Sequence, residues 1–432
     1  MSVSKGLLLH LLFAGSLSAA DFPVGDVASF DEAMKKAVAG DTITLQSGEW
    51  KDVDLRVRGQ GEKGKPITVR AAEPGKVVLA GNSRLRFGGQ HLWVEGLWFK
   101  NCLPANADIV TFREDSKKLA NDCVLRACAI TQDQASTDSK ERKWVSLYGA
   151  QNLVEGCHFE GKTSKGTLLV VWLPEEGGGA PPKHRAERNY FGSRPRLGKN
   201  GGEIIRIGDS ESSMQRAECV VEGNFFEKCD GEVECISNKS CGNVYRGNRF
   251  VECQGTVTMR HGNGCLIVDN VFEGNHRKQT GGIRVIGEDH VVEGNYLTGI
   301  EGDEARSAIC LQNGIEGSPA NGYFQVKRAV IKNNTVLDCK TSITIGYADK
   351  DVKALLPPAD SEIVGNYVEA GEKPVVTLTD PTAKITWKDN VMWGSATGVG
   401  AVPGISFNEI KMKRLVPKTP AKNEVGVAWL RP

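Results

Sequence analysis

A short phrase centred on asparagine recurs along most of the chain. Each copy has an apolar residue, any residue, a glycine or polar residue, asparagine, any residue and a second apolar residue. Four consecutive asparagines lie 24, 22 and 25 residues apart. A repeat period in the low twenties is typical of a solenoid. The clear copies are VEGNFFE (221–227), YRGNRFVE (245–252), IVDNVFEG (267–274), VEGNYLTG (292–299), IKNNTVLDC (331–339), IVGNYVEAG (363–371) and WKDNVMW (387–393).

The residues around these asparagines favour strands over helices. The segments are rich in Val, Ile, Thr and Phe, and they alternate apolar with polar residues, whereas a helical repeat would place apolar residues three and four apart. Asparagine tolerates the left-handed conformation of a sharp corner, and stacked asparagine side chains hydrogen-bond between coils. We therefore expect Asn224, Asn248, Asn270 and Asn295 to be structural corner residues. The sequence predicts an all-β fold, a right-handed parallel β-helix with one coil per repeat.

The ends and the interruptions of the repeat have their own patterns. Ser29 and Glu32 form a capping-box pattern that opens a short helix through Ala37. Such a helix would cap the solenoid, whose first coil otherwise exposes an unpaired strand edge. Residues 163–185 and 300–325 lack the repeat and are predicted to be loops that project from the coils.

The first twenty residues are typical of a secretion signal. Lys5 precedes an apolar run over residues 6–17 that is too short to span a bilayer, and small residues follow at 18–20. We therefore predict a signal peptide over residues 1–20 and export to the periplasm or the extracellular medium. No later segment is apolar enough to cross a membrane.

The rest of the chain divides into a β-helix domain over residues 21–400 and a tail over residues 401–432 that packs on it.

The formal net charge is only +1, so no global field marks a nucleic-acid-binding protein. Attraction for a polyanion must come from a local patch.

Twelve cysteines in an exported chain raise the possibility of disulfides. Their spacing does not form a compact framework, and several fall within the repeat. We expect mostly buried thiols that pack as small hydrophobic groups, with disulfides as the alternative. Zinc is disfavoured because no pair of CxxC motifs occurs.

The least ordinary stretch runs from residue 200 to 262. Alignment of its coils on the repeated asparagines places Val233 and Cys235 beside Val257 and Met259, which predicts that these four side chains point inward. Strand alternation then directs the side chains between them outward.

The outward side chains of this stretch are charged. Glu232 and Glu234 lie on one coil and Arg260 on the next, with Lys239 nearby and Asn200 and Arg206 on the preceding coil. Carboxylates and an amide oxygen are hard donors that suit calcium better than zinc or copper. A solvated row of salt-bridged charges is the competing interpretation.

These residues resemble polysaccharide lyase family six, which contains alginate lyases and the dermatan-sulfate-cleaving chondroitinase B. The resemblance rests on NGGEIIRIG at 200–208, CDGEVECISNKS at 229–240 and RHG at 260–262, in the expected order and spacing, and it extends over roughly residues 22–400. It implies the β-helix, a uronate polysaccharide as substrate and Ca²⁺ as cofactor. It also implies roles for five residues: Lys239 as Brønsted base, Arg260 as acid, and Asn200, Glu232 and Glu234 as calcium ligands. Because an acid role is unusual for a guanidinium, a water or His261 is expected to complete it.

Three further side chains have two interpretations each. Arg206 and Arg284 are expected to pair with sugar carboxylates, with structural salt bridges as the alternative. His261 either contacts substrate or hydrogen-bonds within its turn.

The resulting hypothesis is an alginate lyase that cleaves by β-elimination, acting as a monomer or weak dimer. A chondroitinase B-like dermatan sulfate lyase is the alternative within the same chemistry. A non-catalytic polysaccharide-binding β-helix is the alternative from another class, since a fold alone does not specify function. A pectate lyase or an epimerase is also compatible with the fold.

Overall fold

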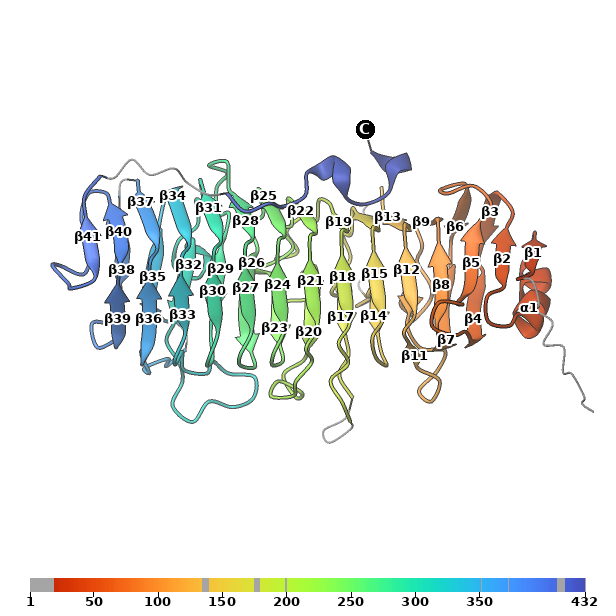
Figure 1. The fold of residues 1–432 in the computed structure, drawn as a ribbon, viewed down its shortest axis with the longest axis horizontal. Coiled ribbons are helices and arrows are strands. Elements are labelled where there is room, and N and C mark those ends of the chain that lie inside the picture. The colour runs from red at the N-terminus through yellow and green to blue at the C-terminus, as the bar shows by residue number, and fades with distance from the viewer. Residues whose placement is uncertain are drawn as a thin grey trace, which may run out of the picture.

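The computed structural model describes residues 19–133, 140–174, 179–198, 200–350, 352–371, 373–409 and 416–431. Most of the predicted signal peptide, residues 1–18, lies outside the described residues. The described chain winds into a long solenoid of three parallel sheets (Figure 1), as the repeat predicts. Each regular coil contributes one strand to sheet A, one to sheet B and one to sheet C, in that order.

The three sheets run the length of the solenoid. Sheet A contains β1 (Asp21–Val24), β2 (Thr42–Leu45), β5 (Ile67–Ala71), β8 (Leu92–Glu95), β12 (Val124–Arg126), β15 (Leu153–Glu155), β18 (Arg185–Glu187), β21 (Val220–Glu222), β24 (Val244–Arg246), β27 (Leu266–Val268), β30 (Val291–Glu293), β33 (Val330–Lys332), β36 (Ser361–Val364) and β39 (Ile385–Lys388). Sheet B contains β3 (Gly48–Lys51), β6 (Val77–Ala80), β9 (Leu97–Lys100), β13 (Ala129–Thr131), β16 (His158–Glu160), β19 (Tyr190–Phe191), β22 (Phe225–Glu227), β25 (Arg249–Val251), β28 (Val271–Glu273), β31 (Tyr296–Thr298), β34 (Thr335–Cys339), β37 (Tyr367–Ala370), β40 (Asn390–Trp393) and β41 (Ile405–Phe407). Sheet C contains β4 (Asp54–Gln60), β7 (Arg84–Gln90), β10 (Val110–Thr111), β11 (Ala120–Asn121), β14 (Val145–Leu147), β17 (Leu169–Val171), β20 (Ile205–Gly208), β23 (Glu234–Lys239), β26 (Thr256–His261), β29 (Ile283–Val285), β32 (Ile309–Gln312), β35 (Ile343–Tyr347) and β38 (Val376–Leu378).

The repeated asparagines form a ladder at the corner between sheets A and B. The side-chain oxygen of each accepts hydrogen bonds from the backbone N–H and the side-chain NH₂ of the asparagine one coil earlier, for example from Asn248 to Asn270 at 3.0 Å each. The corner prediction is confirmed, but the left-handed residue is the one before the asparagine, such as Gly247 (φ 61°) or Asp269 (φ 54°). The asparagine stays outside that region because its side chain has to point inward along the ladder. The ladder contains Asn189, Asn224, Asn248, Asn270, Asn295, Asn334, Asn366 and Asn390.

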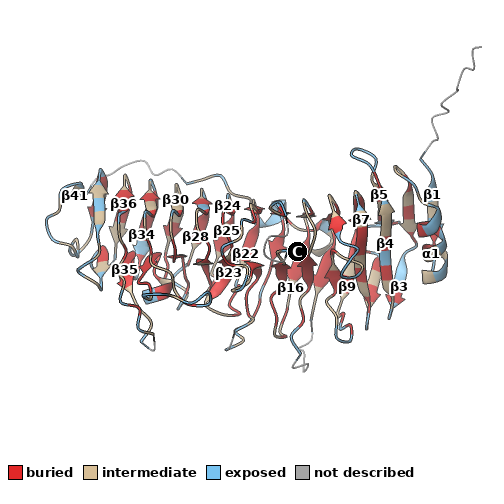
Figure 2. Cartoon of the chain, turned by 90° about the horizontal axis from the view of Figure 1, so that it is seen from below, coloured by how far each residue is buried: buried red, intermediate tan, exposed pale blue. Residues whose placement is uncertain are grey.

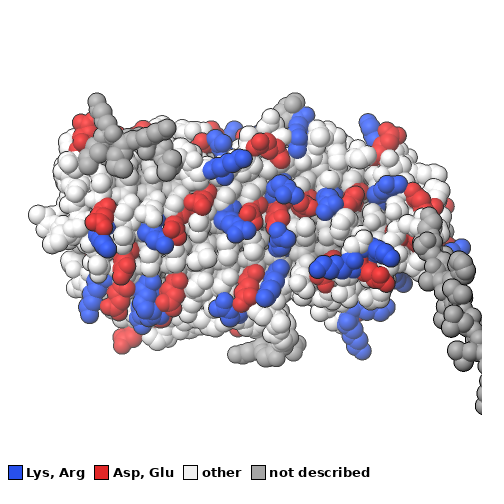
Figure 3. Space-filling model, in the orientation of Figure 1, with Lys and Arg blue, Asp and Glu red and all other residues white. Residues whose placement is uncertain are grey.

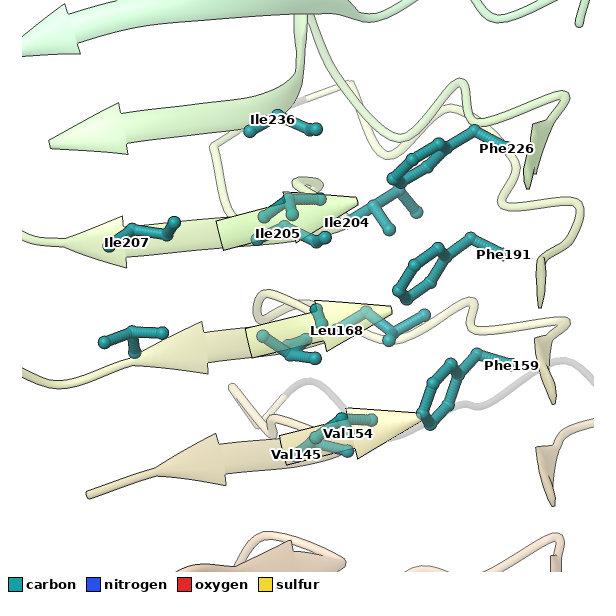
Figure 4. Close-up of a cluster of buried hydrophobic side chains, with 14 of the residues drawn as sticks. Val145, Val154, Phe159, Leu168, Phe191, Ile204, Ile205, Ile207, Phe226 and Ile236 are labelled. Carbon is teal, nitrogen blue, oxygen red and sulfur yellow. The ribbon is translucent and has the colours of Figure 1, made fainter. Parts of the chain in front are cut away.

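The interior is filled by layers of identical or similar side chains. Phe159, Phe191, Phe226, Phe250 and Phe272 stack on successive coils, with ring centroids 4.5–5.3 Å apart. Buried residues follow the solenoid along its whole length (Figure 2). Stacking of like residues gives each coil a preformed surface on which the next packs. The aliphatic layer opposite the rings contains Val145, Ile205 and Ile236 (Figure 4).

A short helix, α1 (Val27–Lys36), covers the first coil as predicted, but its start differs from the prediction. Asp26 is the N-cap residue, and its carboxylate accepts the backbone N–H of Ser29 at 2.7 Å. The backbone N–H of Asp26 in turn donates to the Ser29 hydroxyl oxygen at 3.2 Å. Ser29 therefore occupies position N3 of the capping box rather than the N-cap position. Ala37 is the C-cap and lies outside the helix.

The chain beyond residue 400 has two parts. The strand β41 pairs with β40 and so continues sheet B past the predicted domain boundary. Residues 416–431 then return towards the middle of the solenoid (Figure 1), where η2 (Lys422–Glu424) and η3 (Ala428–Leu430) lie. There the Lys422 ammonium pairs with Glu227 at 2.7 Å, and Val425 packs against Tyr190. The predicted loops over 163–185 and 300–325 each contain a strand of sheet C, β17 and β32, as well as η1 (Glu304–Arg306) in the second.

Charges of both signs intersperse over the face shown in Figure 3. Ion pairs between neighbouring coils of sheet A account for many of them, for example Arg126 with Glu155 at 2.9 Å and Lys332 with Glu293 at 3.1 Å.

All twelve cysteines lie in the described part of the chain and are buried with free thiols, as predicted. No helix among the described residues is long and apolar enough to cross a membrane.

Two buried histidines predict sensitivity to acid. Burial lowers the pKa of His184 to about 3 and that of His290 to about 4, whereas an unfolded histidine titrates near 6.5. The Nδ1 atom of each accepts a backbone N–H of the preceding coil, from Asn152 and Cys265 respectively. In the window from about pH 6.5 down to 4 the unfolded chain binds protons that the folded chain does not, so stability falls as the pH falls.

Thermal unfolding followed by circular dichroism between pH 7 and 4 checks this expectation. Asn243 occupies the corresponding position of another coil and accepts the N–H of Cys219 through its side-chain oxygen. The double variant His184→Asn with His290→Asn should therefore fold and show a shallower loss of stability on acidification. An unchanged pH dependence would contradict the assignment.

Candidate functional site: a charged cavity on sheet C

Two bulges shape the strands that carry the charged residues. The predicted pairing of Val233 with Val257 and of Cys235 with Met259 is wrong: Ile236 pairs with Val257, and Asn238 pairs with Met259. The register shifts once after Glu234 and once before Lys239, which leaves an extra residue in each strand. A simple alignment of coils misses such insertions, which bend a strand and redirect its side chains.

The extra residue in β26 is Arg260, which lies between the pairs Asn238–Met259 and Lys239–His261. Its side chain lines a cavity rather than the interior. Val233, predicted to point inward, also lines this cavity. Charged groups from three successive coils, those of β20, β23 and β26, surround this one space.

This cavity has a volume of about 510 Å³. It brings together seven of the eight residues singled out in the sequence: Asn200, Arg206, Glu232, Glu234, Lys239, Arg260 and Arg284. The sequence did not single out other charged or polar lining residues: Glu141, Lys165, Glu203, Ser210, Asn321 and Tyr323.

Three carboxylates crowd one side of the cavity. Burial, together with the neighbouring carboxylates of Glu203 and Glu234, raises the pKa of Glu232 to about 9. Glu203 is 5% exposed and accepts a hydrogen bond from the Thr167 hydroxyl at 3.0 Å. The Glu203 position was detectable in the sequence, because it follows the two glycines of the same NGGE motif that contains Asn200.

Arg260 is held by a segment that returns from a coil farther along the solenoid. Its guanidinium donates to the carbonyl oxygens of Gly322 at 2.5 Å and Asn321 at 2.9 Å, and it lies 4.2 Å from the ring centre of Tyr323. Its Nε lies 3.7 Å from the carboxylate of Glu234. These contacts fix the direction of the side chain, and only the tertiary fold brings residues 321–323 to it.

Lys239 is the cavity's least constrained cation. Among the described residues its ammonium group has no hydrogen-bond acceptor or ion-pair partner, although it is only partly exposed. The strand is pinned around it: Lys239 pairs with Gly208 on one side and with His261 on the other. A Cβ at Gly208 would lie 2.4 Å from the carbonyl oxygen of Lys239. Glycine at this position therefore allows the two coils to approach closely where Lys239 sits.

His261 lies behind the cavity rather than in its lining. The ring is 1% exposed, its Nε2 is 3.3 Å from the Ser210 hydroxyl, and its Nδ1 has no hydrogen-bond partner among the described residues. Burial lowers its pKa to about 3, and the charges of Arg260 and Lys239 act in the same direction. The imidazole is therefore neutral at physiological pH.

The two other arginines differ in their surroundings. Arg284 is 3% exposed, donates to the side-chain oxygen of Gln312 at 2.7 Å and pairs with Asp349 at 3.5 Å. Arg206 forms no ion pair within the described residues and stacks over Trp172 at 5.1 Å. Arg206 is thus the more available of the two for an anionic ligand.

The donors present fit a hard cation. Three carboxylates and Asn200 line one side of the cavity. Burial, and then the charges of the neighbouring carboxylates, raise the pKa of Glu232. Oxygen donors of this type suit calcium. Within the described residues no group of three or more His, Cys, Asp or Glu side chains is already arranged to hold a metal, so the set requires Asn200 or a ligand to complete it.

Comparisons with known proteins agree with this site and fold. The chain is similar to the PL6 family alginate lyase AlyGC, with 36% identity and a TM-score of 0.90 over 95% of this chain and 59% of that one. It is also similar to a mannuronic acid specific family 6 lyase from human gut microbiota, with 27% identity, a TM-score of 0.83 and coverage of 91% and 92%. A third similar structure is the polysaccharide lyase Pedsa3628 from Pseudopedobacter saltans, with 29% identity, a TM-score of 0.80 and coverage of 94% and 99%.

The chain therefore spans 59% of the length of AlyGC, but nearly all of the other two structures. No curated protein matches it. The family model of chondroitinase B matches residues 24–423, almost the whole chain. This match, together with the charged cavity on a parallel β-helix, shows that the chain belongs to the chondroitinase B family, polysaccharide lyase family six.

Proposed function

We propose that this protein is an exported lyase that depolymerises alginate by β-elimination. The observation that carries the proposal is the position of Lys239, a lysine without a partner among the described residues, in a cavity that also contains Arg206, Arg260 and a cluster of carboxylates. Some surface lysines of this fold form ion pairs, as Lys332 does with Glu293, whereas Lys239 lines the cavity. The alginate lyases among the similar structures support the choice of polymer.

Lys239 is the proposed Brønsted base. β-Elimination begins with removal of the C5 proton next to the uronate carboxylate, and an unprotonated amine aimed into the cavity can accept it. Arg260 lies one coil away, at a strand spacing of about 4.8 Å, and lines the same cavity. Close packing of Gly208 against the backbone of Lys239 fixes the position of this backbone, from which the lysine side chain extends.

Arg260 is proposed to stabilise the leaving oxygen at C4. Its guanidinium is oriented by the carbonyl groups of Asn321 and Gly322 and by the ring of Tyr323. A guanidinium is a poor proton donor, so we assign it mainly to electrostatic stabilisation of the developing negative charge. Neutral, buried His261 supports the strand beside Lys239 rather than contacting the polymer.

Calcium is the proposed cofactor. Asn200, Glu203, Glu232 and Glu234 would hold it at the acidic side of the cavity, and bound calcium would neutralise the uronate carboxylate, which makes the C5 proton more acidic. Arg206 and Arg284 are proposed to bind carboxylates of the polymer on the same face. The predicted signal peptide supports export, where calcium and polymer are both accessible.

A dermatan sulfate lyase is the second candidate, because the matching family model is that of chondroitinase B. Both polymers contain uronates, so the same cavity suits either. The choice between them depends on how the residues around the cavity accommodate sulfated sugars.

Incubation with poly-mannuronate, poly-guluronate and dermatan sulfate in the presence of calcium tests the proposal. We expect alginate blocks to give a product that absorbs in the ultraviolet, because elimination leaves a C4–C5 double bond conjugated with the carboxylate. Cleavage of dermatan sulfate alone would favour the second candidate. New reducing ends without the chromophore would indicate a hydrolase, and binding without cleavage would indicate a non-catalytic protein.

A further inference from the structure

Arg194 is a buried cation behind the carboxylates of the cavity. It is 1% exposed and has no ion-pair partner among the described residues. Burial lowers the pKa of its guanidinium to about 10, and the carboxylates of Glu203 and Glu232 act in the opposite direction. A cation at such a position is costly unless fixed dipoles satisfy it.

Those dipoles are four backbone carbonyl groups. The guanidinium donates to Glu203 at 2.5 Å, to Gly201 and Gly166 at 2.9 Å each, and to Ser164 at 3.1 Å. The carbonyls belong to two neighbouring coils, so Arg194 joins the segment 164–166 to the segment 201–203.

The Arg194 backbone makes a further connection to the next coil. Its N–H donates to the carbonyl of Lys228 at 3.2 Å, and its carbonyl accepts the N–H of Asp230 at 2.9 Å. Beyond this point the chain passes Gly231, where an added Cβ would lie 2.1 Å from the carbonyl oxygen of Gly202 and 3.1 Å from the Arg194 side chain. One residue thus contacts the backbones that carry both halves of the acidic cluster.

We propose that Arg194 is a positioning residue whose side chain fixes the turn carrying Asn200 and Glu203. The turn carrying Glu232 packs on that turn where Gly231 meets Gly202, so the carboxylates stay gathered around the cation-binding space. The proposal rests on the calcium-assisted function described above. The planar fork of Arg194 ties the turn carrying Asn200 and Glu203 to the segment 164–166 of the preceding coil. The Arg194 backbone holds the start of the turn carrying Glu232 through its hydrogen bonds to Lys228 and Asp230.

The variant Arg194→Lys separates geometry from charge. Lysine retains the positive charge, but its single ammonium group cannot serve four carbonyls distributed over two coils. Loss of the fork should weaken calcium binding by about 10-fold or more, the range found when supporting groups around metal ligands are removed. If Arg194 acted only through its charge, lysine would preserve the affinity.

Two measurements on the full chain test this. Calorimetric titration with calcium alone should show the weaker affinity in Arg194→Lys. Hydrogen exchange of the metal-free protein should show faster exchange in residues 164–166 and 200–204, the segments that the guanidinium joins. Lys162→Met is the matched control: Lys162 is also fully buried and donates to Ser164, but it contacts neither turn of the cluster. It should lower the melting temperature and leave the calcium affinity unchanged.

Unchanged affinity and exchange in Arg194→Lys would overturn the proposal. If Arg194→Lys does not fold, Arg194→Gln replaces it in both measurements, and failure of both to fold would assign Arg194 to general stability and overturn the proposal as well. If the parent protein binds no calcium, the cofactor assignment fails, while exchange in the metal-free protein still decides the role of Arg194.

Discussion

The variant Lys239→Ala should lose nearly all formation of ultraviolet-absorbing product while its circular dichroism spectrum stays that of the parent. Removal of a positioned general base typically costs about 10²- to 10⁴-fold in rate. The fold should tolerate the change because the Lys239 ammonium makes no hydrogen bond or ion pair within the described residues. Initial rates on the best alginate block, compared at saturating substrate, measure the effect.

Two further variants serve as controls for the assignment of Lys239 as the base. Lys239→Arg keeps a positive charge but cannot accept a proton, so it should be about as inactive as Lys239→Ala if the residue is the base. Lys228→Ala removes a half-exposed lysine whose ammonium lies 3.8 Å from Glu252, outside the cavity, and should retain full activity. Near-normal turnover by Lys239→Ala would place the base elsewhere.

Removal of calcium with a chelator should abolish turnover with much less effect on the melting temperature. The variant Glu232→Gln should require far more calcium for activity, since one charged ligand is replaced by a neutral one. In chelator at pH 7 its melting temperature should equal or exceed that of the parent. The reason is that Glu232, with its pKa raised to about 9, is mostly protonated in the metal-free folded protein.

Activity as a function of free calcium, with thermal unfolding in parallel, checks both statements. Glu252→Gln is the control, because Glu252 pairs with Lys228 outside the cavity. Full activity of the parent in excess chelator would exclude calcium from the mechanism. It would leave the assignment of Lys239 and Arg260 to be tested separately.

The fold could be predicted from the sequence because its determinants are local and repeated. The asparagine at each corner satisfies a backbone N–H of the preceding coil through its own side chain, so the residue type itself encodes the stacking. Alternation of apolar and polar residues then determines which side faces the interior. The position of α1 was predicted only approximately, since both Asp26 and Ser29 can accept a hydrogen bond at a helix start.

The members of the candidate site could also be predicted, because their motifs lie at equivalent positions of successive coils. Asn200, Glu232, Lys239 and Arg260 come from three neighbouring coils and line one cavity. Their chemical roles remain a proposal. Glu203 was missed, although it follows the two glycines of the NGGE motif that contains Asn200.

The sequence by itself determined the solenoid, its interior face and the coils that carry the charged residues, since each depends on a short period that is visible in one dimension. Only the tertiary structure decided the exact register, because a bulge adds one residue without changing the repeat, and the bulge at Arg260 is what pairs His261 with Lys239. Only the tertiary structure also brought Tyr323 to Arg260 and Arg194 beneath Glu203 and Glu232. These contacts join segments that no local pattern relates, and they depend on how the loops fold back over the coils.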